Sequence, residues 1–326
     1  MPYVGGDRPT GEAVLTYAIE AHGLAKTFGD KMAVSGVDLK VPAGSIYGFL
    51  GQNGAGKTTT LRMLLGILTP DAGYATILGD DYPLTIADRI GYLPEERGLY
   101  PAMTARETIA FMGALRGLPL KEGRARAEEL LSRHGLESEI NAKIRTFSKG
   151  MAQKVQLLGS FVHEPDLIIL DEPFSGLDPV NQGALEAIIT KERDRGATIL
   201  FSTHIMSHAE RLCDGLVIIA GGRTRFTGSV ADARSVLPAQ VVVKTRLPLD
   251  NAIGDLPGTF ARDAAGRYRF PLPPEGLDAT LKRLAAANVE IIELTTERPT
   301  LHDAFVAMVG DPEAKDFNAR ADGGAR

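Results

Sequence analysis

The stretch GQNGAGKT, residues 51–58, decides the fold of this chain. It follows GSIYGFL (44–50), an apolar run that reads as a β-strand, and it opens KTTTLRMLLGIL (57–68), which reads as a helix. Glycines at such a junction let backbone amides wrap around phosphate oxygens where a Cβ would clash, and the start of the helix favours an anion. The stretch therefore predicts a phosphate-binding loop in an α/β fold.

Two polar residues of this loop have distinct roles at a phosphate. Lys57 places a positive charge on the β and γ oxygens, and the Thr58 hydroxyl can bind Mg²⁺. The alternative interpretation is a Gly-rich turn without a ligand. A strand before the loop and a helix after it favour the phosphate site.

A second polar cluster lies in DLIILDEP, residues 166–173. This stretch reads as a buried apolar strand that ends in two adjacent carboxylates. Asp171 can hold Mg²⁺, and Glu172 can orient and deprotonate a water in line with the γ-phosphate. His204 follows the strand TILFST (198–203), at the sheet edge where α/β proteins bind ligands. A solvated Asp-Glu pair and a structural histidine are the alternatives, and the phosphate loop favours the catalytic interpretation.

Between about Tyr17 and Gly228, short apolar runs alternate with helical stretches. GLVIIAGG (215–222) predicts another strand, and ALEAIITKERDR (184–195) predicts a helix. Apolar strands separated by helices indicate a mainly parallel sheet covered on both faces. We therefore predict one α/β domain over residues 17–235.

The region from about Leu99 to Phe147 has helical patterns and no strand pattern. Thr104 and Glu107 fit a capping box at the start of its first helix. We predict a helical subdomain inserted at about 99–146.

After Ser235 the composition changes. The pattern predicts strands at 239–245, 266–272 and 289–295 and helices at 276–287 and 299–309. These elements predict a small C-terminal α/β domain over 236–310. Residues 1–16 and 311–326 lack a pattern and are predicted to be flexible tails.

Composition bounds the class of protein. The chain has 326 residues, a net charge of −5 and no Lys/Arg run longer than two, which speaks against a nucleic-acid groove. Cys213 is the only cysteine, so no internal disulfide can form, and its simplest role is that of a small buried residue. The sequence shows no secretory signal and no apolar run long enough to span a membrane, so we expect a cytoplasmic protein.

FSKGMAQ, residues 147–153, suggests a further anion site. Ser148 and Gly150 stand at the start of a predicted helix, where free backbone N–H groups and a hydroxyl meet. The phosphate loop already provides one anion site. The sequence up to this point does not say which phosphate the second site would bind.

Six motifs in order give the chain a family resemblance. It resembles the ATP-binding subunits of ABC transporters over about residues 18–230, through GQNGAGKT (51–58), YLPEE (92–96), FSKGMAQ (147–153), LIILDEP (167–173), SGLDP (175–179) and STH (202–204). The resemblance implies a P-loop NTPase fold, with ATP and Mg²⁺ as ligands. It also implies a second ATP-binding subunit, because FSKGM is similar to the signature segment that contacts the γ-phosphate held by the other subunit.

The resemblance also implies roles for individual residues. Phe28 would stack on adenine, Asp171 would serve Mg²⁺, Glu172 would be the base, and His204 would be the switch histidine. The residues that would cradle the triphosphate are Gly51, Asn53, Gly54, Ala55, Gly56, Lys57, Thr58 and Thr59. Ser148 and Gly150 would face the partner's ATP, and Asp178 would belong to the loop that links the two active sites.

The chain departs from the family pattern at two places. In the signature, Phe147, Lys149 and Met151 replace the usual Leu, Gly and Gln, and Lys149 can point either to phosphate or to solvent. Glu95 stands where most members have a glutamine. We hypothesise that Glu95 binds Mg²⁺; the alternative is that it lies outside the coordination shell.

YLPEERGLYP, FSKGM and the C-terminal ERPTLHDAFVAMVG resemble ATPase subunits of ABC-2-type exporters, with sodium-export and drug-export members most similar. This implies a separate membrane permease that docks on the helical subdomain and holds the chain at the inner face of the membrane. A homodimer is the simplest pairing. The alternatives are a soluble ABC ATPase acting on ribosomes or in DNA repair, and a nucleotide-binding regulator without turnover. The C-terminal domain can serve packing or regulation.

Overall fold

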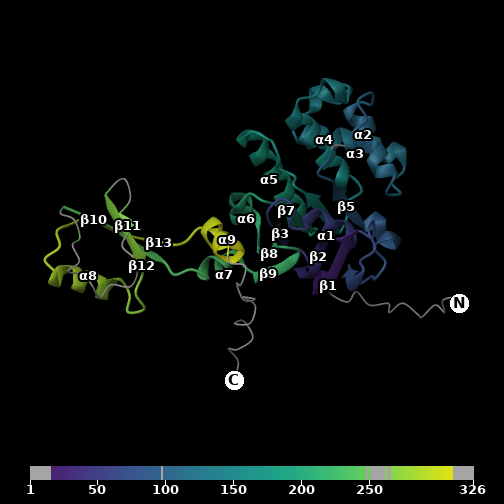
Figure 1. Ribbon diagram of the computed structural model, residues 1–326. Helices are drawn as coiled ribbons and strands as arrows, with labels where there is room; N and C mark the ends of the chain where they lie inside the picture. The colour runs from purple at the N-terminus through teal and green to yellow at the C-terminus, as the bar shows by residue number, and fades with distance from the viewer. Residues whose placement is uncertain (1–15, 97, 247–248, 250–260, 263–265, 311–326) are drawn as a thin grey trace. The chain divides into compact units, whose positions relative to one another are not determined.

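The computed structural model describes residues 16–96, 98–246, 249, 261–262 and 266–310 (Figure 1). The described residues group into two compact units, one falling within 1–204 and 219–224 of the sequence and the other within 205–218 and 225–326. The predicted tails, 1–16 and 311–326, lie outside the described residues except for Thr16. None of the described helices combines the length and the apolar character needed to cross a bilayer.

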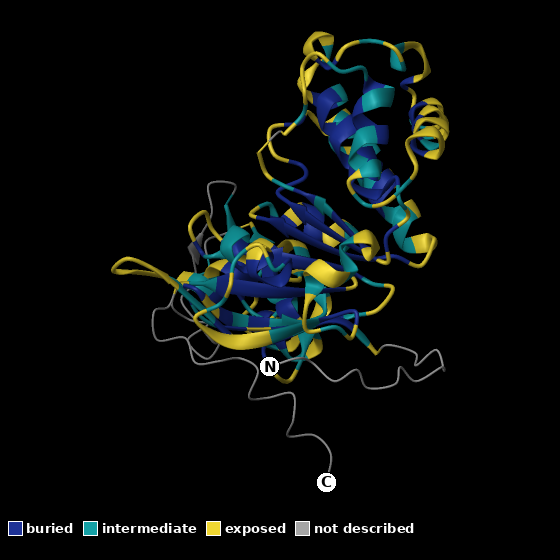
Figure 2. Cartoon of the chain, turned by 90° about the vertical axis from the view of Figure 1, so that its right-hand side faces the viewer, coloured by how far each residue is buried: buried dark blue, intermediate teal, exposed yellow. Residues whose placement is uncertain are grey.

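A six-stranded sheet carries the phosphate loop. Its strand order is β5-β6-β7-β3-β8-β9. The strands are β3 (Ile46–Leu50), β5 (Ile90–Leu93), β6 (Leu167–Asp171), β7 (Thr198–Thr203), β8 (Gly215–Ala220) and β9 (Arg223–Gly228). Strands β5, β6, β7 and β3 pair in parallel, and every residue of β3, β6 and β7 is buried (Figure 2). The predicted α/β fold with a mainly parallel sheet is confirmed.

A three-stranded antiparallel sheet lies in the same unit, with the order β2-β1-β4. Its strands are β1 (Tyr17–Phe28), β2 (Lys31–Pro42) and β4 (Ala72–Ile77). The helical elements of this part of the chain are α1 (Lys57–Leu64), η1 (Pro83–Arg89) and α5 (Pro179–Asp194).

Residues between β5 and β6 form helices. These are α2 (Ala105–Ala114), α3 (Leu120–Arg133), η2 (Glu137–Glu139), η3 (Ile144–Thr146) and α4 (Lys149–Phe161). Helix α2 packs against α3 and α4. The predicted capping box is present, because the Thr104 side chain accepts from the Glu107 N–H while the Glu107 side chain accepts from the Thr104 N–H.

The second unit contains a four-stranded antiparallel sheet with the order β11-β12-β10-β13. Besides most of β8 and β9, the elements of this unit are α6 (Met206–Leu212), α7 (Val230–Ser235), β10 (Gln240–Thr245), β11 (Ala261–Arg262), β12 (Arg267–Pro271), α8 (Leu277–Ala286), β13 (Ile291–Glu297) and α9 (Leu301–Gly310). The core of this sheet consists of Val241, Val243, Tyr268, Phe270 and Leu284.

After β13 the chain packs against helices that precede the four-stranded sheet in sequence. Helix α9 contacts α6 and α7, and the Leu301 N–H donates to Glu210 at 2.7 Å. Cys213 ends α6 as a free cysteine, and burial raises the pKa of its thiol.

Candidate functional site

The loop between β3 and α1 requires glycine at specific positions. Gly56 precedes Lys57 with φ of 101°, and a Cβ on Gly56 would lie 2.7 Å from the Ala33 carbonyl oxygen. Gly54 also has a positive φ, of 81°. A Cβ on Gly51 would lie 2.8 Å from the Ile219 carbonyl oxygen. Side chains at Gly51 and Gly56 would displace the loop, so its amides keep this arrangement only with glycine there.

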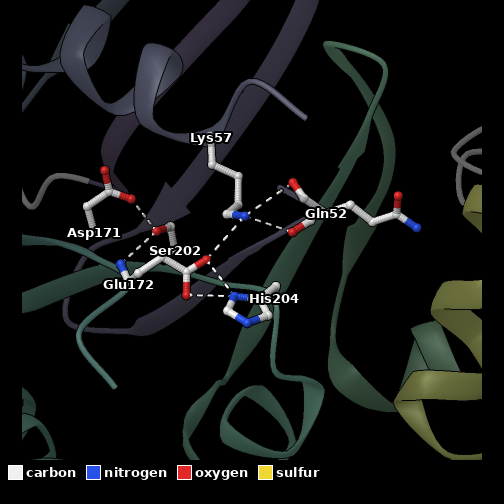
Figure 3. A network of polar contacts seen from close by, with 7 residues as sticks. Gln52, Lys57, Asp171, Glu172, Ser202 and His204 are labelled. Carbon is white, nitrogen blue, oxygen red and sulfur yellow. Dashed lines mark hydrogen bonds and ion pairs between the residues drawn. The ribbon is translucent and has the colours of Figure 1, made fainter. Parts of the chain in front are cut away.

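Lys57 lies folded back over the loop. Its amine donates to the carbonyl oxygens of Gly51 at 2.8 Å and Gln52 at 3.3 Å. The same amine lies 3.2 Å from Oε1 of Glu172, and each side chain is only 6% exposed. Figure 3 shows the Glu172 carboxylate between Lys57 and His204. Nδ1 of His204 is 3.0 Å from both carboxylate oxygens, and its ring is partly open to solvent.

Glu172 has an unusual backbone conformation, with φ of 49°. Such a conformation is disfavoured for a residue with a Cβ and is often found at functional sites. The Glu172 N–H donates to Oγ of Ser202 at 2.9 Å, which ties the residue to the neighbouring strand β7. The end of β6 is therefore held in a strained conformation that presents the carboxylate to Lys57 and His204.

Asp171 ends β6 with its carboxylate buried. Ser202 Oγ donates to Oδ1 at 2.5 Å, whereas the buried Oδ2 has no hydrogen-bond partner among the described residues. A buried carboxylate oxygen without a partner is costly unless a cation neutralises it. The Asp171 carboxylate and the Thr58 hydroxyl both offer oxygen ligands of the kind that Mg²⁺ prefers. The residues present fit a magnesium ion.

Most predicted nucleotide residues line one cavity of about 400 Å³. The lining consists of Phe28, Lys31, Ala33, Asn53, Gly54, Gly56, Lys57, Thr58, Thr59, Glu95 and Glu172. Gly51 and Ala55 belong to the loop itself and are buried. Asp171 and His204 contact the cavity indirectly, through Ser202 and Glu172.

The cavity lining also includes an aromatic ring, Phe28, and a charged side chain, Lys31. The Phe28 ring is half exposed and lies 6.0 Å from the Lys26 amine. Lys31 and Ala33 follow it in β2, and sequence reasoning missed both. The signal was present, because Lys31 lies only three residues after Phe28 in KTFGDK.

A second polar cluster lies outside the residues that line this cavity. Ser148 caps α4, where its Oγ accepts from the Met151 N–H at 3.2 Å. Gly150 is buried, and a Cβ there would lie 2.6 Å from the Asn181 side chain. Asn181 in turn donates its backbone N–H and side-chain amide to Asp178, at 3.0 and 2.6 Å. These bonds lower the pKa of the Asp178 carboxyl. Ser148, Gly150 and Asp178 therefore form one cluster at the starts of α4 and α5.

Lys149 bears on the question that the sequence left open. Its side chain is exposed, and a Cβ on Gly176 would overlap its amine. Gly176 has φ of 65°, which glycine adopts without strain. Lys149 thus lies over the 175–178 loop.

Helix α4 also contacts the loops beside the cavity. Gln153 donates to the Pro173 carbonyl at 3.1 Å, just after Glu172, and Gln156 donates to the Glu96 carbonyl at 3.3 Å, just after Glu95. Sequence reasoning did not assign either glutamine. The Glu95 side chain is exposed and lines the cavity.

Tyr92 precedes Glu95 on the same segment and responds to the acidic site. Burial raises the pKa of its hydroxyl, and the charges of Asp171 and, less, Glu95 raise it further. A hydrogen bond to Arg62 and the positive charge of that side chain oppose this rise in pKa.

Comparison with known proteins places these features in a family. A family model described as ABC transporter matches residues 34–175. The chain is 36% identical over 289 residues to the uncharacterized ABC transporter ATP-binding protein YhaQ of Bacillus subtilis (strain 168), covering 88% of this chain and 97% of that protein. It is 32% identical over 315 residues to the Nod factor export ATP-binding protein I of Rhizobium etli, covering 95% and 98%.

A solved structure of an ATP-binding subunit of an ABC transporter is similar in fold. It superposes with a TM-score of 0.61 at 36% sequence identity and covers 67% of this chain and 92% of that chain.

Proposed function

Because this chain belongs to the ATP-binding subunits of ABC transporters, we propose that two copies close around two ATP molecules and drive export through a separate membrane permease. Its activity is the hydrolysis of ATP coupled to transport. The export direction follows the ABC-2 exporter resemblance and the name of the Rhizobium etli relative, a Nod factor export protein. The transported substrate is selected by the permease, which is a separate chain.

The first step is binding of the triphosphate by the loop that begins α1. Asn53, Gly54, Gly56 and Thr59 line the cavity, and we assign them with Gly51 and Ala55 to the phosphates. Lys57 moves its charge from Glu172 to the phosphate oxygens. Phe28 supplies a ring for adenine to stack on, as its exposed face allows.

We assign Mg²⁺ to Thr58 and Asp171, with Glu95 as a further candidate ligand. When bound, the ion neutralises charge on the β and γ oxygens. Asp171 is already oriented by Ser202, so its second oxygen is free for the ion.

Glu172 is the proposed general base. Once Lys57 binds phosphate, the Glu172 carboxylate keeps His204 as its partner and accepts a proton from water. His204 holds the carboxylate in place and contacts the γ-phosphate. Its ring is partly exposed, so it can do both.

The observation that carries the two-copy proposal is the separation of the two clusters. Ser148 and Gly150 begin helix α4 with polar groups suited to an anion, yet they do not line the cavity of their own chain. A second copy can bring its own α4 start to the γ-phosphate, with Asp178 in the adjoining loop. Closure then depends on ATP, and hydrolysis weakens it.

Docking of the permease is proposed on the helices between β5 and β6. Tyr100, Leu115 and Leu120 are exposed large apolar side chains of this region. Docking there would hold the chain at the inner face of the membrane. A soluble ABC ATPase and a regulator without turnover are not favoured by the family relationship.

The two-copy proposal is tested in a Glu172→Gln background, in which ATP should remain bound. We expect an ATP-dependent dimer by analytical ultracentrifugation. Adding Ser148→Arg should abolish the dimer while leaving ATP binding intact. Ser132→Arg, on the exposed side of α3, is the matched control and should dimerise normally. Dimers that form equally well with Ser148→Arg would refute the proposal.

A further inference from the structure

The second unit contains a hollow of about 390 Å³ that is remote in sequence from the nucleotide loop. Its lining comes from α7, from the α7–β10 connection and from the β13–α9 connection: Ala231, Arg234, Ser235, Leu237, Pro238, Ala239, Arg298 and Pro299. This volume lies in the range of small-molecule sites. We infer that the hollow binds a phosphate group carried on a small organic molecule or lipid.

Arg234 is fixed in place at the hollow. Its Nε donates to the Pro299 carbonyl oxygen at 2.7 Å, which orients the guanidinium, and within the described residues both Nη groups remain available to a ligand. Its side chain is half-buried in the fold. Binding a ligand would therefore cost less desolvation and less side-chain ordering than at a fully exposed arginine.

Arg298 supplies a second positive charge. It is exposed, and within the described part of the chain it makes no hydrogen bond or ion pair. The nearby carboxylates have other partners, since Asp232 accepts from Ser229 and Glu297 pairs with Arg269 at 3.0 Å. The described lining of the hollow holds two cations and no carboxylate.

The charge balance favours a phosphate monoester. Two guanidinium groups match its charge of about −1.5 to −2, and their planar forks suit its oxygens. A single carboxylate would leave one positive charge unmatched. Leu237, Pro238 and Pro299 give the hollow an apolar wall, which suits an organic group attached to the phosphate.

The position of the hollow gives binding a consequence. Its lining includes both chain connections between the helices α7 and α9 and the four-stranded sheet. A ligand bridging Arg234 and Arg298 would restrain these connections together. Amide hydrogen exchange in the two connections, at Val236, Leu237, Ala239, Arg298 and Thr300, should therefore slow when the site is occupied.

Two probes distinguish the sources of the phosphate group. Inorganic phosphate is titrated into the full chain by calorimetry with Mg²⁺ and ADP saturating, and vesicles of phosphatidylcholine with or without phosphatidic acid are sedimented with the chain. If the natural ligand is a soluble phosphate ester, the chain should bind inorganic phosphate and should not sediment with either kind of vesicle. If the natural ligand is a lipid headgroup, the chain should sediment with vesicles that contain phosphatidic acid and not with phosphatidylcholine vesicles alone.

The Arg234→Gln/Arg298→Gln variant should weaken whichever binding is seen by at least about tenfold, because both charge-assisted contacts are lost. Its basal ATPase should be unchanged. Arg246→Gln, at the opposite end of β10, is the matched control and should bind as before. If the paired variant fails to fold, Arg298→Gln alone tests the inference. Within the described residues Arg298 makes no hydrogen bond or ion pair, so this single substitution should leave the fold intact and still weaken binding. Binding to neither probe, or binding that the paired substitutions leave unchanged, would overturn the inference.

Discussion

The Lys57 amine lies 3.2 Å from Oε1 of Glu172, and both side chains are almost fully buried. The proposed phosphate-binding cation and the proposed base thus neutralise each other in this arrangement. The phosphates of ATP would compete with Glu172 for this lysine, so the ion pair sets a cost on phosphate binding.

Glu172→Gln should reduce ATP turnover at least about 10²-fold, because a neutral amide cannot take the proton from water. The same substitution removes the competitor for Lys57, so ATP should bind at least as tightly as in the wild type. Steady-state hydrolysis and equilibrium dialysis measure the two effects. Turnover at the wild-type rate would remove Glu172 from the role of base.

Ser202→Ala should lower the free energy of unfolding by about 3 kcal/mol, because the buried Asp171 carboxylate loses its described hydrogen bond and the Glu172 N–H loses its acceptor. The loss should shrink with Mg²⁺ and ATP, since the cation compensates Asp171. Denaturant unfolding with and without Mg·ATP measures this. Ser160→Ala is the control, because the Ser160 hydroxyl is buried but donates only within its own helix, to Leu157. Equal losses in the two variants would contradict the prediction.

Glu95→Gln should raise the Mg²⁺ concentration for half-maximal ATPase several-fold, since a carboxylate binds this ion more strongly than an amide. Glu96→Gln is the control, because it is the backbone carbonyl of Glu96 that bonds to Gln156. An unchanged Mg²⁺ requirement in Glu95→Gln would place that side chain outside the coordination shell.

Gly176→Ala should destabilise the fold by about 1 kcal/mol, because an alanine is strained at φ of 65°. The added methyl would also overlap the Lys149 amine, but that flexible end can move. The loss should therefore persist when Lys149→Ala is added. Gly183→Ala, within α5 and with nothing near its Cβ position, should be neutral or stabilising. Full recovery in the double variant would show that the lysine, and not the backbone, causes the strain.

His163 should make stability depend on pH. Burial lowers the pKa of its imidazole from 6.5 to about 4, although a bond to the Ile90 carbonyl opposes the shift. The unfolded chain takes up a proton near pH 6.5 that the folded chain refuses, so this stability is present above pH 6.5 and is lost as pH falls from about 6.5 to about 4.

His163→Gln should therefore reduce proton uptake on unfolding near pH 5 by close to one. Unfolding free energies measured from pH 4 to 7 give this slope. His302→Gln, on the exposed side of α9, is the control. A slope equal to that of the wild type would contradict the assignment.

Sequence patterns predicted the elements that are uniformly apolar or strongly periodic. TILFST corresponds to β7 residue for residue, because all six side chains are buried. The antiparallel β1–β2–β4 sheet was not predicted. Strand β1 mixes buried and exposed positions irregularly, with register shifts beside Gly23. Strand β4 is exposed over its first three residues and has only one buried residue, so neither strand has a clear period.

The motifs predicted most residues that line the cavity beside Lys57, but not the groups that hold this region in shape. Ser202 was part of a recognised motif, yet its bonds to Asp171 and Glu172 depend on the pairing of β6 with β7. The left-handed conformation of Glu172 likewise has no local signal, because it is imposed by the surrounding tertiary contacts.

Helix α4 has a consequence for the proposed pair of subunits. This one helix carries Ser148 at its start. Through Gln153 and Gln156 it also binds the backbone next to Glu172, the proposed base, and next to Glu95. A shift of either loop on ATP binding would tilt the surface offered to the neighbour's ATP. The two sites would then be thermodynamically coupled, and ATP hydrolysis should rise with a Hill coefficient above one.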